Sequence, residues 1–223
     1  MKLVIGNKNY SSWSMRPWLL MTQLGIAFEE ERLHFGDPAW KARARGYAPT
    51  GLVPILIDGD LTVWDSLAIV EYLAEKYPSH GVWPAAAPAR ARARSIVAEM
   101  HAGFSALRGA LSMNCELRVV MQPLDRAVRQ DLARVFEIWA GCQAQLPAGG
   151  GPFLFGAFSA ADAFYAPVVR RLVSYGIELP EVARRYVAAQ EALPAMRAWM
   201  ADALAEHEFV PWEETYRDSA EPR

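Results

Sequence analysis

The pattern of apolar and polar positions divides the chain into two parts with different periods. In the first eighty residues, short apolar or alternating runs typical of strands are interleaved with runs of helical spacing. Asp58-Gly59 separates two strand-like runs and predicts a hairpin turn. The expected elements are a strand at 3–5, a helix from Ser14 to Gly25, a strand at 28–34, a short helix at 38–45, two strands around the hairpin, and a helix that Ser66 caps and Tyr77 ends. Their order is βαβαββα.

After residue 88 only the helical period remains. Pro and Gly breaks separate five helix-like stretches, at 89–111, 123–145, 159–175, 181–192 and 194–206. The third begins with Ser159-Ala-Ala-Asp162, a variant capping box that needs only a folding role. We therefore expect an α/β domain at 1–80, a linker at 81–88 and an all-α domain at 89–223.

Composition and charge narrow the functional classes. The chain is 52% hydrophobic and 22% charged with a net charge of −2, which is ordinary for a soluble globule and gives no reason to expect nucleic-acid binding. Neither the two cysteines nor the four histidines have metal-site spacing, so we expect no metal. No stretch reaches the roughly 18 apolar residues of a membrane span, and the first residues are too short an apolar run for a signal peptide. These features predict a cytoplasmic protein without membrane contact.

Three serines lie between the first expected strand and the first expected helix. Ser11, Ser12 and Ser14 fall within four residues. A single serine there would be a helix N-cap, and we assign that role to Ser14. Three hydroxyls at the positively polarised end of a helix predict a site that holds an anion.

A second segment with candidate chemistry surrounds the hairpin. Pro54 cannot donate to a strand ladder and must begin a strand or lie at an edge, and a cis bond after Val53 would suit it. Asp65-Ser66 precedes the next helix. Taken alone, that pair is an N-cap with an acidic neighbour.

Together with the serine run, these motifs resemble the cytosolic glutathione transferases over nearly the whole chain. Val53-Pro54, Asp65-Ser66 and the stretch from Gly156 to Asp162 occur in that family's order. The run from Ser11 to Arg16 is most similar to the Ser-Ser-Cys-Ser-x-Arg signature of the zeta class, with Trp13 in place of the cysteine. The resemblance implies a thioredoxin-like first domain, a helical bundle as the second, and a homodimer.

The resemblance also implies roles for these residues. Ser11 would be the catalytic hydroxyl that ionises the thiol of glutathione, a co-substrate, with Ser12 and Ser14 close by. Backbone groups of Val53, exposed by cis-Pro54, would pair with the cysteinyl part of glutathione. Asp65 would hold the γ-glutamyl ammonium and Ser66 its carboxylate.

The electrophile that the thiolate attacks should be small and hydrophobic, and should lie between the domains. The candidates that line its site are Trp13, Arg108 and Asn114. Packing in the core is the alternative interpretation for most apolar residues near them.

Some positions depart from the family's pattern. Leu52 stands where members often place Lys or Gln to hold the glycyl carboxylate, so Lys41, Arg43 or Arg45 would have to replace it. Zeta-class isomerases use an arginine where this chain has Ser174, with Arg170 and Arg171 one turn earlier. A maleylacetoacetate-type isomerase and a non-catalytic binder of glutathione or hydrophobic compounds therefore stay open as alternatives. Ser174 and the bulky Trp13 argue against the isomerase.

Overall fold

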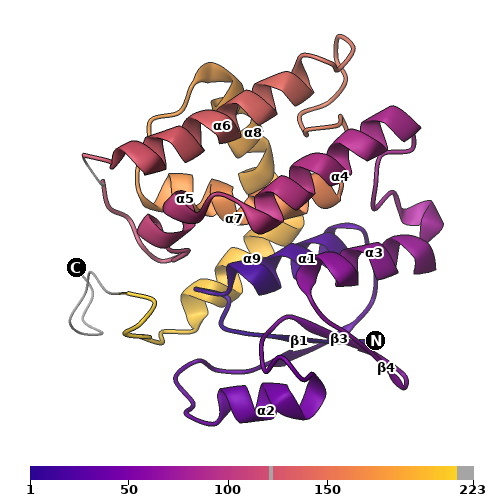
Figure 1. Cartoon of the computed structure of the whole chain (residues 1–223), viewed down its shortest axis with the longest axis vertical. Helices are drawn as coiled ribbons and strands as arrows, with labels where there is room; N and C mark the ends of the chain where they lie inside the picture. The colour runs from indigo at the N-terminus through magenta and orange to yellow at the C-terminus, as the bar shows by residue number, and fades with distance from the viewer. Residues whose placement is uncertain (121–122, 215–223) are drawn as a thin grey trace.

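The computed structural model describes residues 1–120 and 123–214, in which a sheet-containing part lies against a larger group of helices (Figure 1). The order in the first part is β1-α1-β2-α2-β3-β4-α3, as the sequence predicts. It is a thioredoxin-like arrangement followed by a helical domain. The predicted fold class is therefore confirmed.

The sheet has four strands in the order β2-β1-β3-β4. β1 (Lys2–Ile5) runs parallel to β2 (Glu29–Arg32) and antiparallel to β3 (Ile55–Asp58). β3 turns at Gly59 into the antiparallel β4 (Leu61–Val63), so the predicted hairpin is present. Because β1 is buried on both faces, it forms the centre of the first domain.

Helices cover both faces of this sheet. Leu3 and Ile5 belong to the main core with α1 (Ser12–Gln23) and α3 (Ser66–Lys76), whereas Val4 packs with α2 (Trp40–Tyr47). Figure 1 shows α2 alone on the outer face, with α1 and α3 on the side facing the helical domain. Because successive side chains of β1 point to opposite faces, Leu3 and Ile5 lie on the face that packs toward the helical domain.

The predicted N-cap residues of α1 and α3 are wrong. Ser11, and not Ser14, is the N-cap of α1, because its side chain accepts from the Ser14 amide. Asp65, and not Ser66, caps α3, with its carboxylate accepting from the Leu67 amide at 2.8 Å. In both cases the helix begins earlier than expected, because another polar side chain N-terminal to the expected cap already satisfies the first-turn amides.

The helical domain follows the short 3-10 helix η1 (Pro78–His80). Its helices are α4 (Ala87–Ala102), α5 (Ser105–Ala110), α6 (Arg126–Gln143), α7 (Ala160–Ser174), α8 (Glu181–Ala192) and α9 (Pro194–Ala205). The start of α4 reaches into the predicted linker. The predicted all-α domain at 89–223 extends to residues 215–223, which lie outside the described residues.

The single helix predicted at 89–111 is wrong, because α4 and α5 are separate. Gly103 ends α4 with its amide on the Glu99 carbonyl, and a Cβ there would lie 2.7 Å from that oxygen. Phe104 follows with φ of 56°, in the left-handed region. The apolar spacing continues through the break, so periodicity alone did not reveal it.

Helix α7 is the buried centre of the second domain and packs on both α1 and α4, while α9 packs on α1. After α9 the chain returns to the loop before α1, where the Glu206 carboxylate accepts from the amides of Lys8 and Asn9. The N-terminal end of α1 is therefore held by both domains and by the C-terminal segment.

No helix within the described part of the chain is long and apolar enough to cross a membrane. Among residues 1–120 and 123–214, no group of His, Cys, Asp and Glu could hold a metal ion.

Candidate active site

The serine run forms a short hydrogen-bonded chain at the start of α1. Ser11 Oγ donates to Ser14 Oγ at 2.8 Å, and Ser14 Oγ also accepts from the Gly6 amide at 3.1 Å. Ser14 is fully buried, whereas Ser11 and Ser12 reach the surface of a cleft. The three hydroxyls are therefore not equivalent: Ser14 connects Ser11 to the end of β1, and Ser11 and Ser12 face the open space.

That cleft has a volume of about 530 Å³ and lies at the junction of the two domains. Its walls come from the serine run, the loops after β1 and β2, the segment before β3, α5, α7 and the C-terminal segment. The lining residues are Tyr10, Ser11, Ser12, Trp13, Phe35, Trp40, Leu52, Val53, Ser105, Arg108, Gly109, Ser112, Met113, Arg171, Trp212 and Glu213. A cleft of this size and mixed polarity is typical of a small-molecule site.

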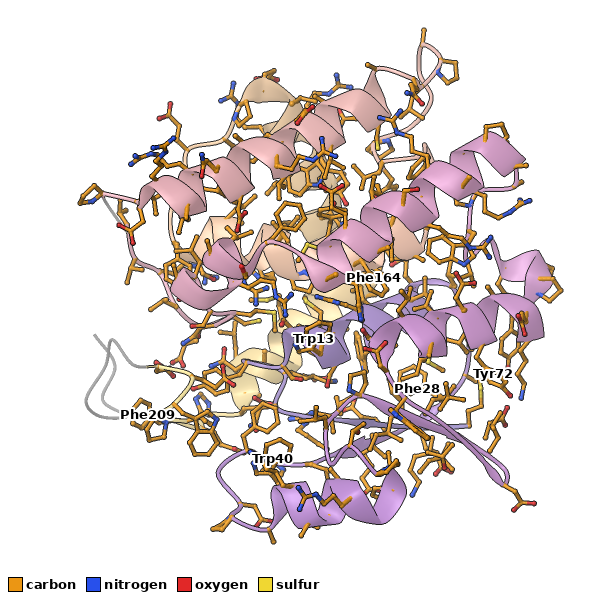
Figure 2. All side chains as sticks on the ribbon, viewed as in Figure 1. Trp13, Phe28, Trp40, Tyr72, Phe164 and Phe209 are labelled. Carbon is orange, nitrogen blue, oxygen red and sulfur yellow. The ribbon has the colours of Figure 1, made fainter. Side chains whose placement is uncertain are left out.

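Trp13 is the aromatic centre of this junction (Figure 2). The Arg16 guanidinium lies 4.0 Å from its ring centroid and the Arg108 guanidinium 4.7 Å. The His101 ring meets it edge-on at 5.2 Å. Two guanidinium groups thus make cation–π contacts with the same indole, so the cleft wall beside the serines is electropositive.

The arginines near Trp13 raise the local positive potential. Burial, together with the charges of Arg171 and Arg108, lowers the pKa of Arg16 to about 9. Burial and the charge of Arg108 lower the pKa of Arg171 to about 10. Arg16 and Arg171 remain protonated at neutral pH, and the repulsion between these cations and Arg108 makes a bound anion favourable.

Asp65 and Ser66 lie near this cluster but do not line the cleft. His101 Nε2 is 3.2 Å from Asp65 Oδ2, an ion pair when the histidine is protonated. Burial lowers the pKa of His101, and Arg16 and Arg108 lower it further, against the opposing charge of Asp65. Ser66 Oγ is buried and has no hydrogen-bond partner within residues 1–120 and 123–214.

The Val53–Pro54 bond is cis, and Val53 lines the cleft. Leu52 beside it is 57% exposed. Of the three cations considered in its place, Arg43 pairs with Asp37 and Glu31, and Arg45 lies against Gly51. Lys41 lines a second hollow that shares Phe35, Trp40 and Trp212 with the cleft.

The structure divides the remaining candidates. Arg108 lines the cleft, but Asn114 is buried outside it, and its side-chain carbonyl accepts from the amides of Glu116 and Leu117. Asn114 therefore holds the loop after α5 rather than facing the cleft. The Ser174 hydroxyl donates to the backbone carbonyl of Asn114 at 2.7 Å.

Arg171 and the C-terminal segment also form cleft walls, which was not expected from the sequence. Arg171 Nε donates to the Leu111 carbonyl at 2.7 Å, which fixes it at the cleft, whereas Arg170 turns away to Glu191. Trp212 and Glu213 complete the wall, and the Tyr10 hydroxyl holds their segment, because it lies within hydrogen-bond distance of both the Glu214 carboxylate and the Glu208 carbonyl. No local pattern marks such long-range contacts.

Arg16 was also not expected at the site, although the sequence offered one indication: it is the single charged residue of α1.

Two family models match the chain, that for the glutathione S-transferase N-terminal domain over residues 10–76 and that for the C-terminal domain over residues 124–202. The chain belongs to the glutathione S-transferase family. The serine run and Asp65-Ser66 both lie in the segment that matches the N-terminal model of this family.

Relatives within the family have different activities. The chain is 27% identical to a probable maleylacetoacetate isomerase of Vibrio cholerae, over 95% of this chain and 98% of that protein. It is 44% identical to dichloromethane dehalogenase of Methylophilus leisingeri, but over 28% of this chain and 24% of that protein. The chain thus matches about a quarter of the length of that dehalogenase.

Solved structures of glutathione S-transferases have the same fold. A glutathione transferase homolog from Burkholderia with bound glutathione superposes with a TM-score of 0.67 at 24% identity, over 92% of this chain and 98% of that one. A bacterial zeta-class maleyl pyruvate isomerase gives a TM-score of 0.63 at 24% identity, over 91% and 98%. These similarities establish the fold.

Proposed function

We propose that this protein is a glutathione transferase that uses Ser11 to ionise the thiol of glutathione for attack on a small hydrophobic electrophile. The observation that carries the proposal is the hydroxyl chain Gly6–Ser14–Ser11, which ends at the cleft. Ser11 is both the N-cap of α1 and a wall of the cleft.

The chain of hydroxyls can activate a thiol because each hydroxyl both donates and accepts. When a thiolate accepts a hydrogen bond from the Ser11 hydroxyl, Ser14 Oγ turns its own proton toward Ser11 Oγ, and the Gly6 amide continues to donate to Ser14 Oγ. Linked hydrogen bonds of this kind polarise one another. Ser11 is then the catalytic donor and Ser14 a positioning residue behind it, and Ser12 has no place in the chain.

The energy required is modest. A free thiol has a pKa near 8.5, and lowering it by one unit needs about 1.4 kcal/mol. One hydrogen bond to a charged acceptor contributes about 1.5–3 kcal/mol. The N-terminus of α1 and the cations around Trp13 act in the same direction.

Glutathione's other groups have candidate partners in the cleft and beside it. Val53 backbone groups pair with the cysteinyl part, Asp65 and Ser66 hold the γ-glutamyl end, and Lys41 holds the glycyl carboxylate. Lys41 is favoured over Arg43 because Arg43 is already paired with two carboxylates. The electrophile lies against Trp13 and Arg108.

A glutathione-dependent cis-trans isomerase is the second candidate. Arg108 and Arg171 both line the cleft and would attract a carboxylate of an acidic diene. The full-length similarity to a probable maleylacetoacetate isomerase supports the same reaction. A non-catalytic binder remains the third candidate, and only assays of turnover separate it from the other two.

The test is retention on immobilised glutathione followed by two assays, conjugation to an aromatic chloride and isomerisation of a cis-dienoic diacid. We expect conjugation to fall about 10- to 100-fold in Ser11→Ala, by the loss of one charged hydrogen bond, with binding retained. Ser14→Ala should lose less, and Ser12→Ala is the matched control. Inactivity of Ser14→Ala with full activity of Ser11→Ala would refute the assignment, and retention without turnover would support the binder.

Family membership also supports a homodimer in the cytoplasm, with no metal. Light scattering of the purified protein tests the assembly directly.

A further inference from the structure

Glu213 is the one carboxyl group among the described residues that line the cleft. It belongs to the wall that the C-terminal segment forms, in the same cleft as Ser11. The other ionisable side chains of the described lining are Tyr10, Arg108 and Arg171. An acidic side chain in a wall that is otherwise electropositive needs an explanation, and the charge of Arg171 acts on it directly.

Hydrogen bonds fix the backbone of Glu213 at this wall. The Ser112 hydroxyl donates to its backbone carbonyl at 3.0 Å, and its amide donates to the Val210 carbonyl at 3.0 Å. Val210 is fully buried and packs with Tyr10 and Phe35, which come from the loops after β1 and β2. Both domains therefore hold the segment that carries this carboxyl group, and a group held in this way can deliver a proton to a defined place.

The ionisable groups of the lining differ in how readily they give up a proton. Burial raises the pKa of Glu213, and the charge of Arg171 opposes this rise. A carboxyl group with a raised pKa is suited to general acid catalysis, because its protonated form persists closer to neutral pH. Burial and the Glu214 carboxylate raise the pKa of the Tyr10 hydroxyl, and the pKa of Arg171 is about 10, so both of these groups are weaker acids than Glu213.

The need for a proton donor depends on the electrophile. An aryl chloride needs none, because chloride leaves as an anion. A thiolate that adds to a double bond beside a carbonyl group creates an enolate, and the addition reverses unless the α-carbon is protonated. Arg108 and Arg171 line the same cleft and would stabilise the enolate oxygen, which leaves the α-carbon to be protonated by Glu213.

We propose that Glu213 is a general acid of the electrophile site, which completes the addition of glutathione to an α,β-unsaturated carbonyl compound. This inference rests on the proposed function, because it requires the glutathione thiolate as nucleophile. The sulfur forms a bond to the β-carbon, and the electron pair of the double bond moves onto the α-carbon and the carbonyl oxygen. The O–H bond of Glu213 then breaks, its proton forms a C–H bond at the α-carbon, and its electron pair stays on the carboxylate. Solvent returns to Glu213 a proton equivalent to the one that the thiol lost on ionisation.

The test compares an aryl chloride with the enone benzylideneacetone, using wild type, Glu213→Gln and Glu178→Gln. Glutamine keeps the size and polarity of the side chain but cannot transfer the proton. In Glu213→Gln, kcat/KM for the enone should fall about 100-fold, whereas kcat/KM for the aryl chloride should change by less than about 3-fold. Glu178 is exposed and is not part of the cleft lining, so Glu178→Gln, with the same loss of charge, should leave both values unchanged. Equal changes for the two electrophiles in Glu213→Gln would overturn the inference.

The stereochemistry of the adduct supplies a measurement on wild type alone. In heavy water the Glu213 carboxyl group exchanges to O–D, so wild type should deliver deuterium to one face of the α-carbon. NMR of the fresh product should then show mainly one diastereomer. A mixture from wild type would overturn the inference, because the deuterium would come from bulk solvent, and so would turnover of the aryl chloride without turnover of the enone. If wild type is not retained on glutathione and reacts with neither electrophile, the proposed function itself fails.

Discussion

Asp162 and Arg16 are both charged and almost completely buried, but their surroundings are opposite. The Asp162 carboxylate accepts from the amides of Leu154 and Ser159, from the Ser159 hydroxyl and from the Tyr186 hydroxyl, at 2.9–3.2 Å. Arg16 has no such partner among the described residues. The chain itself supplies the hydrogen bonds of the buried Asp162 carboxylate, whereas the Arg16 guanidinium contacts the rings of Trp13 and Phe164.

The serine run contains the same contrast on a smaller scale. Ser14 is buried and hydrogen-bonded to both Gly6 and Ser11, so it supports structure, whereas Ser12 lines the cleft and takes no part in this hydrogen-bonded chain. Ser11 lies between the two, since it is bonded to Ser14 and also reaches the cleft. Because of this position, Ser11 could accept a hydrogen bond from Ser14 and donate one to a thiolate in the cleft.

The largest effect should come from removing the satisfied charge. Asp162→Ala leaves several buried donors without an acceptor, and we expect the free energy of unfolding to fall by about 3–5 kcal/mol. Urea unfolding measures this loss. Ser159→Ala, which removes the reciprocal half of the capping box, should cost about 1 kcal/mol. Equal losses in the two variants would contradict the central role of Asp162.

A pH dependence should accompany the same carboxylate. Burial raises the pKa of Asp162 to about 6 against the hydrogen bonds that lower it. The folded state therefore binds the proton more tightly than the unfolded chain, whose pKa is near 3.9, so this contribution to stability falls as pH rises from about 4 to about 6.

We expect the loss from Asp162 across this range to be roughly 2–3 kcal/mol. The measurement is the difference in unfolding free energy between wild type and Asp162→Asn at several pH values, because the subtraction removes the other titrating groups. A difference that does not change between pH 4 and pH 6.5 would show that the carboxylate keeps an ordinary pKa.

The smallest effect on stability should come from removing the unsatisfied charge. Arg16→Met without ligand should change the free energy of unfolding by less than about 1 kcal/mol, or raise it, because an apolar side chain avoids the desolvation of an unpaired cation. Thermal unfolding of the ligand-free protein checks this. A loss comparable with that of Asp162→Ala would show that Arg16 supports the fold and would remove the contrast.

Local sequence signals predicted the parts of the molecule that depend on neighbours in the chain. The short apolar run at Leu3–Ile5, the Asp58-Gly59 turn and the Ser159–Asp162 capping box each act over a few residues, so the order of elements in the first domain and the start of α7 followed from them. The cap of α1 was missed by three residues and that of α3 by one, because nearby polar side chains compete for the same amides.

The parts that the sequence could not predict depend on distant contacts. Arg171 reaches the cleft because its guanidinium is fixed on the Leu111 carbonyl, and its neighbour Arg170 is held away by Glu191. Asn114 was expected in the electrophile site but is used to hold a loop. The burial of Arg16 Nε and Nη1 without hydrogen-bond partners among the described residues likewise depends on how the two domains pack together, and not on α1 alone.

The central claim, that Ser11 ionises bound glutathione, is tested most directly by the pKa of the bound thiol. Ultraviolet difference spectra of the thiolate, recorded against pH for the complex with wild type and with Ser11→Ala, give this value. We predict a pKa at least about one unit below the free value near 8.5 in wild type, and its return by about one unit or more in Ser11→Ala. The same lowered pKa in both proteins would contradict the claim.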